Sequence, residues 1–167
     1  YIAEKIALQA KQLEHVIFAG YTHPQAIFFA ERLLALLSPE YSHIFYSDNG
    51  STAVEIALKM AFQAKGNGKK LISFQHAYHG DTFGAMAAAG KSPYHQPFWP
   101  YLFEVHSILP PFFGREEESW REFSRAIDRN DIAAFIFEPL IQGAGGMLLH
   151  SKKLLDRRSE EHTSELQ

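Results

Sequence analysis

The stretch that decides the fold is Tyr46-Ser47-Asp48-Asn49-Gly50-Ser51-Thr52-Ala53-Val54-Glu55. Residues 43–47 have the β-branched and aromatic content of a buried strand, and the next three residues are typical of a tight turn. After the turn, apolar side chains recur at steps of three and four residues, which predicts a helix that ends near residue 65. Thr52 and Glu55 have the spacing of a capping box, so we expect the helix to begin near residue 51 or 52.

The start of this helix is a candidate anion site. The first amides of a helix have no acceptor within it, and the helix dipole favours a nearby negative group by about 0.3–1 kcal/mol. Gly50, Ser51 and Thr52 are small, so a phosphate group can approach the backbone. Such junctions also occur in α/β proteins as structural caps without any ligand, so this stretch alone leaves both interpretations open.

Composition restricts the class of protein. The chain has 167 residues, of which 46% are hydrophobic and 21% charged, enough for one domain with a sizeable core. The formal charge is −3, with no basic stripe for nucleic acid, and no signal peptide or membrane span is visible. The absence of cysteine excludes disulfides and thiolate metal sites. We therefore expect a cytoplasmic protein without nucleic-acid or membrane partners.

Both ends of the chain have unusual features. The sequence begins without Met, and helical periodicity is already present at Ile2, which predicts a start within a domain. Residues 158–167 have no apolar period, and the whole run resembles the translation of a short-read sequencing adapter. We therefore expect a non-native tail on a metagenomic fragment, and we exclude it from the fold; the alternative is an ordinary polar C-terminal tail.

The remaining sequence alternates helices with strands. Periodicity and turn signals predict helices at 2–12, 24–37 and 116–128, with strands at 70–74, 102–105 and 132–137. Asp81 is positioned to cap a helix of small residues that runs through residue 89, and Ser151 to open a further helix. This alternation is typical of an α/β fold in which a mainly parallel sheet has helices on both faces.

Polar residues follow the expected strands. In open parallel sheets, ligands bind beyond the carboxyl ends of the strands. Residues 48–51, residues 75–80 and Glu138 with its Gly-rich loop all lie at such ends. The sequence therefore predicts one site that combines an anion-binding turn, an aromatic residue at Tyr78 and a carboxylate.

Three runs, residues 47–55, 78–86 and 138–147, resemble in order the signatures of the class III pyridoxal-phosphate-dependent aminotransferases, of the fold type I group. The resemblance covers residues 1–156 and is strongest to the branch of the family that acts in biotin biosynthesis. It implies a helical segment over 1–38 that leads into the first part of the cofactor-binding large domain, over 39–157, before the tail at 158–167.

The family's site residues can be placed on matching positions. The resemblance assigns the phosphate of pyridoxal phosphate to Gly50, Ser51 and Thr52. It implies that Tyr78 lies over the pyridine ring and borders the substrate, and that His79 and Gly80 position this tyrosine. Glu138 is expected below the edge of the ring.

The resemblance also implies what lies outside this chain. In the family, the Schiff-base lysine and the aspartate that faces the pyridine nitrogen follow the Gly-rich loop at a distance, so we expect no catalytic residue here. We expect the full-length product to be a homodimeric transaminase, with S-adenosylmethionine as amino donor and 8-amino-7-oxononanoate as the keto acid that accepts the amino group. The fragment alone is expected to be inactive.

Three alternatives stay open at this point. The first is another class III omega-aminotransferase with different substrates. The second is a metal-dependent hydrolase that uses His76 and His79, although a zinc site needs three or four converging ligands. The third is a phosphate-binding module without catalytic activity.

Overall fold

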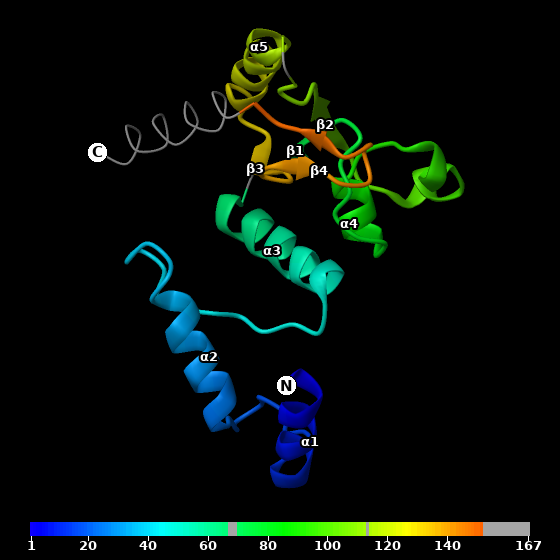
Figure 1. Cartoon of the computed structure of the whole chain (residues 1–167). Helices are drawn as coiled ribbons and strands as arrows, with labels where there is room; N and C mark the ends of the chain where they lie inside the picture. Colours follow the sequence, from blue (N-terminus) through cyan, green and yellow to red (C-terminus); the bar gives the residue numbers. More distant parts are fainter. Residues whose placement is uncertain (67–69, 113, 152–167) are drawn as a thin grey trace. The chain divides into compact units, whose positions relative to one another are not determined.

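A computed structural model describes residues 1–66, 70–112 and 114–151 of the chain. Contacts divide the chain into two compact units, Tyr1–Tyr46 and Ser47–Gln167 (Figure 1). The predicted domain division after residue 38 stays a prediction.

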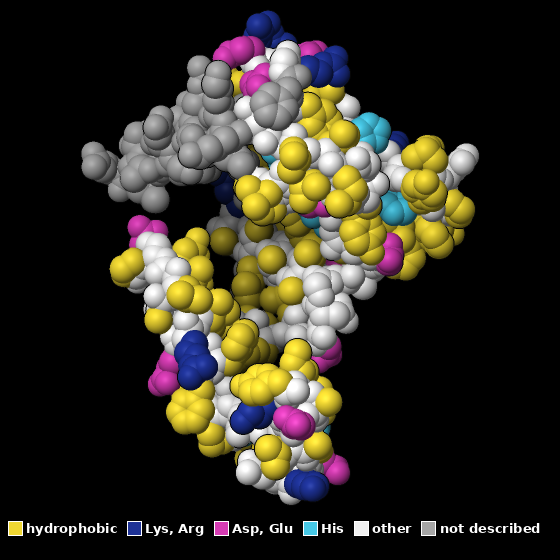
Figure 2. Space-filling view, in the orientation of Figure 1, with side chains coloured by type: hydrophobic (Ala, Val, Ile, Leu, Met, Phe, Trp, Pro, Cys, Tyr) yellow, Lys and Arg dark blue, Asp and Glu magenta, His cyan; other side chains and the backbone are white. Residues whose placement is uncertain are grey.

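The first unit contains two helices, α1 (Ile2–Gln12) and α2 (Pro24–Leu34), which confirms both predicted helices. Pro24 takes the first position of α2, where its missing N–H costs no hydrogen bond. The helix ends three residues earlier than predicted, and a turn follows it. Large apolar side chains lie on the surface of this unit (Figure 2); Ile2 is 74% exposed and Phe28 is 60% exposed.

The strand predicted over residues 43–47 is wrong. The backbone there forms no strand, and the described strands of the chain pair only with one another. The side chain of Tyr46 instead donates a hydrogen bond to the carbonyl of Ala26 at 2.5 Å and stacks on Phe18. A strand needs a hydrogen-bonding neighbour, and composition alone does not supply one.

The second unit is built on a parallel sheet of three strands, ordered β2-β1-β3. The strands are β1 (Lys70–Phe74), β2 (Val105–Ile108) and β3 (Ile132–Ile136). Ile72 in the central strand pairs with His106 on one side and Phe135 on the other. A 3-10 helix, η1 (Pro93–Tyr101), precedes β2, which begins three residues later than predicted.

Helices cover both faces of this sheet, as predicted (Figure 1). They are α3 (Gly50–Lys65), α4 (Phe83–Ala88) and α5 (Glu116–Ile127). On one face, Leu71 packs with Leu58 of α3 and Ala88 of α4. On the other face, Ile72 packs with Phe123 of α5. Successive strand residues therefore face opposite helix layers, which explains why the central strand is buried from Leu71 to Phe74.

A short antiparallel hairpin encloses the Gly-rich loop. Its strands are β4 (Ile141–Gln142) and β5 (Leu148–Leu149). The helix predicted to open at Ser151 and the tail predicted at 158–167 lie outside the described residues, apart from Ser151 itself. Among the helices that the structure describes, none combines the length and hydropathy required to cross a bilayer.

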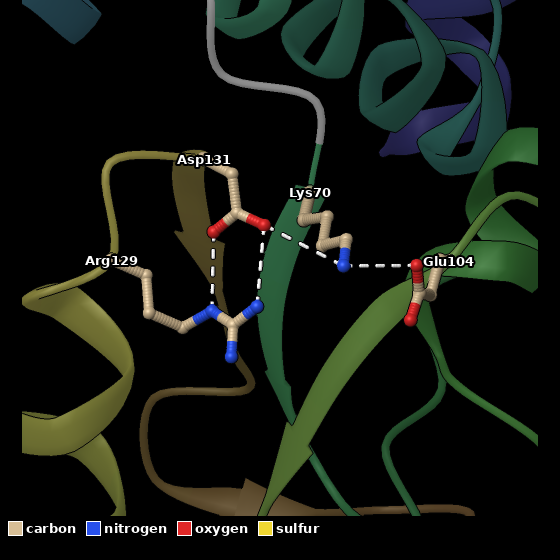
Figure 3. Close-up of polar contacts among 4 residues, drawn as sticks. All are labelled: Lys70, Glu104, Arg129 and Asp131. Atoms are coloured by element: carbon tan, nitrogen blue, oxygen red, sulfur yellow. Dashed lines mark hydrogen bonds and ion pairs between the residues drawn. The ribbon is translucent and has the colours of Figure 1, made fainter.

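Charged residues connect the beginnings of the three strands (Figure 3). Lys70 Nζ lies 3.0 Å from Glu104 and 3.5 Å from Asp131, and Asp131 also pairs with Arg129 at 3.1 Å. The hydrogen bond from Arg129 lowers the pKa of Asp131, and the one to Glu104 raises the pKa of Lys70. These ion pairs lie at the amino ends of the strands, whereas the loops of the candidate site follow the carboxyl ends.

Candidate functional site

Asn49 caps the helix that carries the candidate anion site. Its side-chain oxygen accepts a hydrogen bond from the backbone amide of Thr52 at 3.0 Å. The backbone amide of Asn49 in turn donates to the Thr52 hydroxyl at 3.2 Å. The capping box therefore joins Asn49 to Thr52, and the box predicted between Thr52 and Glu55 is wrong. Asparagine is among the best N-cap residues, so α3 begins at Gly50, one or two residues earlier than predicted.

Two backbone amides at this helix start are suited to a ligand. The Thr52 amide already donates to Asn49, whereas Gly50 and Ser51 hold the first two helical positions, whose amides have no acceptor within the helix. A side chain built on Gly50 would meet nothing within 4 Å, so there is open space beside this backbone. Open space, free amides and the helix dipole fit a phosphate group.

The loop after β1 lies directly against this helix start. Gly80 has φ +130°, and a Cβ on it would overlap the Ser51 side chain, so only glycine permits this contact. The close approach brings the backbone of this loop to the start of α3. Tyr78, two residues earlier, is 43% exposed and available to a ligand.

Asp81 holds the hydroxyl of Tyr78. The phenol donates a 2.8 Å hydrogen bond to the Asp81 carboxylate, and this bond raises the pKa of Tyr78. The N-cap of α4 is Thr82, so the predicted cap at Asp81 is wrong. The carboxylate of Asp81 instead orients the aromatic ring that borders the candidate site.

His79 extends from the same loop toward the sheet. Its Nε2 lies 3.4 Å from the Ser73 hydroxyl on β1. Burial lowers the pKa of His79, although the charge of Glu138 acts in the opposite direction. His79 therefore connects the Tyr78 loop to the central strand.

Glu138 joins two loops that follow neighbouring strands. Its carboxylate accepts from the Tyr78 amide at 3.2 Å and from the Gly143 amide at 3.0 Å. The buried Gln142 adds a second connection, because its side-chain amide donates to the Gln75 carbonyl at 2.9 Å. The loops after β1 and β3 thus meet as predicted, whereas residues 48–51, expected at a third strand end, follow a segment that forms no strand.

His76, a histidine of the metal-hydrolase alternative, lies against the Gly-rich loop. His76 has a φ of 62°, and a Cβ on Gly145 would lie 2.6 Å from its carbonyl oxygen, so the Gly-rich loop packs on its backbone. Within the described parts of the chain, no three His, Cys, Asp or Glu side chains are grouped so that they could hold a metal ion.

Sequence reasoning missed the partners of several polar side chains. Asn49 was interpreted as a turn residue, although asparagine directly before Gly-Ser is also an N-cap signal. Glu55 bonds to Thr82 and to amides of α4, and no local signal indicates this, because 27 to 30 residues separate the partners.

Fold and site together define an α/β protein with a candidate anion site where parallel strands end. A profile of the aminotransferase class-III family matches residues 1–160, and the chain belongs to this family.

Individual relatives agree with this membership. The chain is 43% identical to the adenosylmethionine-8-amino-7-oxononanoate aminotransferase of Synechococcus elongatus, over 93% of this chain and 40% of that protein. The crystal structure of the enzyme with the same name from Methanocaldococcus jannaschii matches with a TM-score of 0.85 and 32% identity, covering 93% of this chain and 36% of that one. A PLP-bound amine transaminase from an uncultivated Pseudomonas species matches with a TM-score of 0.84 and 29% identity, covering 95% and 40%.

The chain thus spans about two fifths of the length of these relatives. The similar structures confirm the predicted fold class, which is part of the large domain of a fold type I transferase.

Proposed function

We propose that this chain is the part of a pyridoxal-phosphate-dependent aminotransferase that binds the cofactor's phosphate and covers its ring. The observation that carries this proposal is the contact between Gly80 and Ser51, because it brings the Tyr78 loop to the free amides of a helix start. When bound, pyridoxal phosphate supplies an electron sink for amino-group transfer.

Each site residue then has a role. The amides of Gly50 and Ser51, with the Ser51 hydroxyl, hold the phosphate, and Thr52 stabilises the cap beside them. Tyr78 packs on the ring and borders the substrate, with its hydroxyl held by Asp81.

Two further residues support that arrangement. His79 holds the loop to β1, and Glu138 accepts a hydrogen bond from the Tyr78 backbone amide. The lysine that bonds the cofactor and the aspartate at the pyridine nitrogen are proposed to lie beyond these 167 residues in the full-length product.

We further propose that the full-length enzyme transfers an amino group from S-adenosylmethionine to 8-amino-7-oxononanoate in biotin biosynthesis. The relative from Synechococcus elongatus, which carries the name of this reaction, supports the proposal. Another class III omega-aminotransferase is the second candidate, supported by the similar amine transaminase. A cytoplasmic homodimer is proposed for either, and the exposed apolar side chains of the first unit are consistent with a protein contact there.

The test begins with recovery of the downstream coding sequence and expression of the full-length product. We expect a lysine in its own loop after a strand that ends in an acidic residue. The purified protein should bind pyridoxal phosphate with a visible absorbance band, and borohydride should attach the cofactor to that lysine. Absence of the lysine, or of any cofactor binding, contradicts the proposal.

Substrate assays separate the alternatives. Consumption of 8-amino-7-oxononanoate with S-adenosylmethionine as donor is the expected result, and transfer only from other amines to other carbonyl compounds indicates a different class III enzyme. Activity that a chelator abolishes indicates a metal hydrolase. A protein that binds inorganic phosphate but never becomes attached to the cofactor is a binding module.

A further inference from the structure

Glu55 of α3 forms the densest set of polar contacts beside the candidate site. Its Oε1 accepts from the Thr82 hydroxyl at 2.5 Å, from the Gly84 amide at 2.7 Å and from the Ala85 amide at 3.2 Å. These donors form the first turn of α4, directly after the Tyr78 loop. One carboxylate oxygen therefore joins the second turn of α3 to the end of that loop.

A second contact lies one helical turn away on the same side of α3. Ser51 and Glu55 are four residues apart, so their side chains share a helix face. Gly80 meets Ser51 and Gly84 meets Glu55, and a Cβ on either glycine would overlap the partner side chain. The segment from 80 to 84 is thus docked on α3 at two points.

Hydrogen bonds keep the Glu55 carboxylate ionised. Burial by itself would raise its pKa, but the bonds from Thr82, Ala85 and Gly84, with the charge of Lys59, lower the pKa overall. Charge-assisted hydrogen bonds are about twice as strong as neutral ones, so these bonds strongly attach the start of α4 to α3.

We propose that Glu55 is a positioning residue: its carboxylate fixes the Tyr78 loop on the first two turns of α3, so that the phosphate-binding amides and Tyr78 meet one ligand in a single geometry. Binding sites depend on such support, because a small displacement of one contact group lowers affinity. This inference rests on the proposed function and goes beyond it, since Glu55 itself touches no part of the cofactor.

Glu122 provides the matched control. It is also a helix glutamate whose carboxylate accepts from a backbone amide, that of Leu109, at 2.7 Å. Its bond joins α5 to the chain after β2, on the sheet face opposite α3. Glu122→Gln and Glu55→Gln therefore each remove the charge from the same type of interaction and keep one acceptor oxygen, and only the second is expected to change the site.

The experiment uses the full-length product, with the cofactor removed and pyridoxal phosphate added back in an equilibrium titration. For Glu55→Gln we expect the Kd to rise about tenfold, because all three donors would then bond to a neutral amide oxygen in place of a charged one. For Glu122→Gln we expect a Kd within about twofold of the wild type. Both variants should lower the thermal midpoint of the cofactor-free protein.

Gly84→Ala tests the same contact without changing the acid. The new Cβ would displace the Glu55 carboxylate, whereas alanine in a helix ordinarily stabilises it relative to glycine. A weaker cofactor affinity in this variant therefore reports the displaced carboxylate. In the Glu55→Ala background, Gly84→Ala should have little further effect, because the overlapping side chain is gone.

A double-mutant cycle with Tyr78→Ala separates positioning from general stability. If Glu55 acts through the Tyr78 loop, the two changes have non-additive effects on the Kd. An unchanged Kd in Glu55→Gln, or additive effects in the cycle, overturns the inference and leaves the proposed function intact. If Glu55→Gln does not fold, the Kd of Gly84→Ala is used in its place, and an unchanged Kd in that variant overturns the inference. A wild-type protein that binds no pyridoxal phosphate overturns the proposed function instead.

Discussion

Ser51 holds the second position of α3, where its amide and its hydroxyl are both available to an anion. In the full-length product, Ser51→Ala should weaken pyridoxal phosphate binding by about 10- to 100-fold, as expected for loss of a hydrogen bond to a charged group. Equilibrium titration measures the change. Ser92→Ala, which removes the cap of η1, is the control and should leave the affinity unchanged.

His79 predicts a pH dependence of stability. Burial lowers its pKa below the value of about 6.5 that it has in the unfolded chain, so in the acidic range the unfolded state binds more protons. The free energy of unfolding should therefore fall as the pH drops through that value. Urea unfolding at pH 7.5 and pH 5.5 should show a larger loss for the wild type than for His79→Gln. Equal losses would contradict this account.

At the scale of elements, Glu138 holds the loops after β1 and β3 with one carboxylate. Its two oxygens accept from two different amides, those of Tyr78 and Gly143. Glutamine offers one acceptor oxygen and one NH₂ donor, so one of the amides would face another donor. We therefore expect Glu138→Gln to resemble Glu138→Ala, with a stability loss on the order of 1–2 kcal/mol and weaker cofactor binding. A near-wild-type Glu138→Gln variant would show that one acceptor is enough.

Elements were predictable where their signals are local. The apolar periods of α1, α3 and α5 and the apolar runs of β1 and β3 lie within single segments, and their bounds agree closely with the structure. The strand predicted at 43–47 failed because strand formation depends on a neighbour. The cap predicted at Asp81 failed because its carboxylate bonds to Tyr78, and spacing does not reveal such a choice.

At the scale of the whole molecule, the chain contains the proposed phosphate site but spans about two fifths of its relatives. We expect the 167-residue chain alone to show no amino transfer and no borohydride-stable attachment of pyridoxal phosphate. Mass spectrometry after borohydride treatment, with the full-length product as positive control, measures the attachment. A modified lysine in the short chain would contradict the proposed position of the cofactor's lysine.

The sequence by itself determined the family and the parallel α/β class, because motif runs and periodic patterns are contained in short segments. Only the tertiary structure decided which hydrogen-bond partner each polar group finds. Glu138 meets an amide 60 residues away, and Glu55, which has the local spacing of a capping box, bonds instead to donors near residue 84. Hydrogen bonds over such separations follow from packing of the sheet and helices, so local sequence cannot specify them.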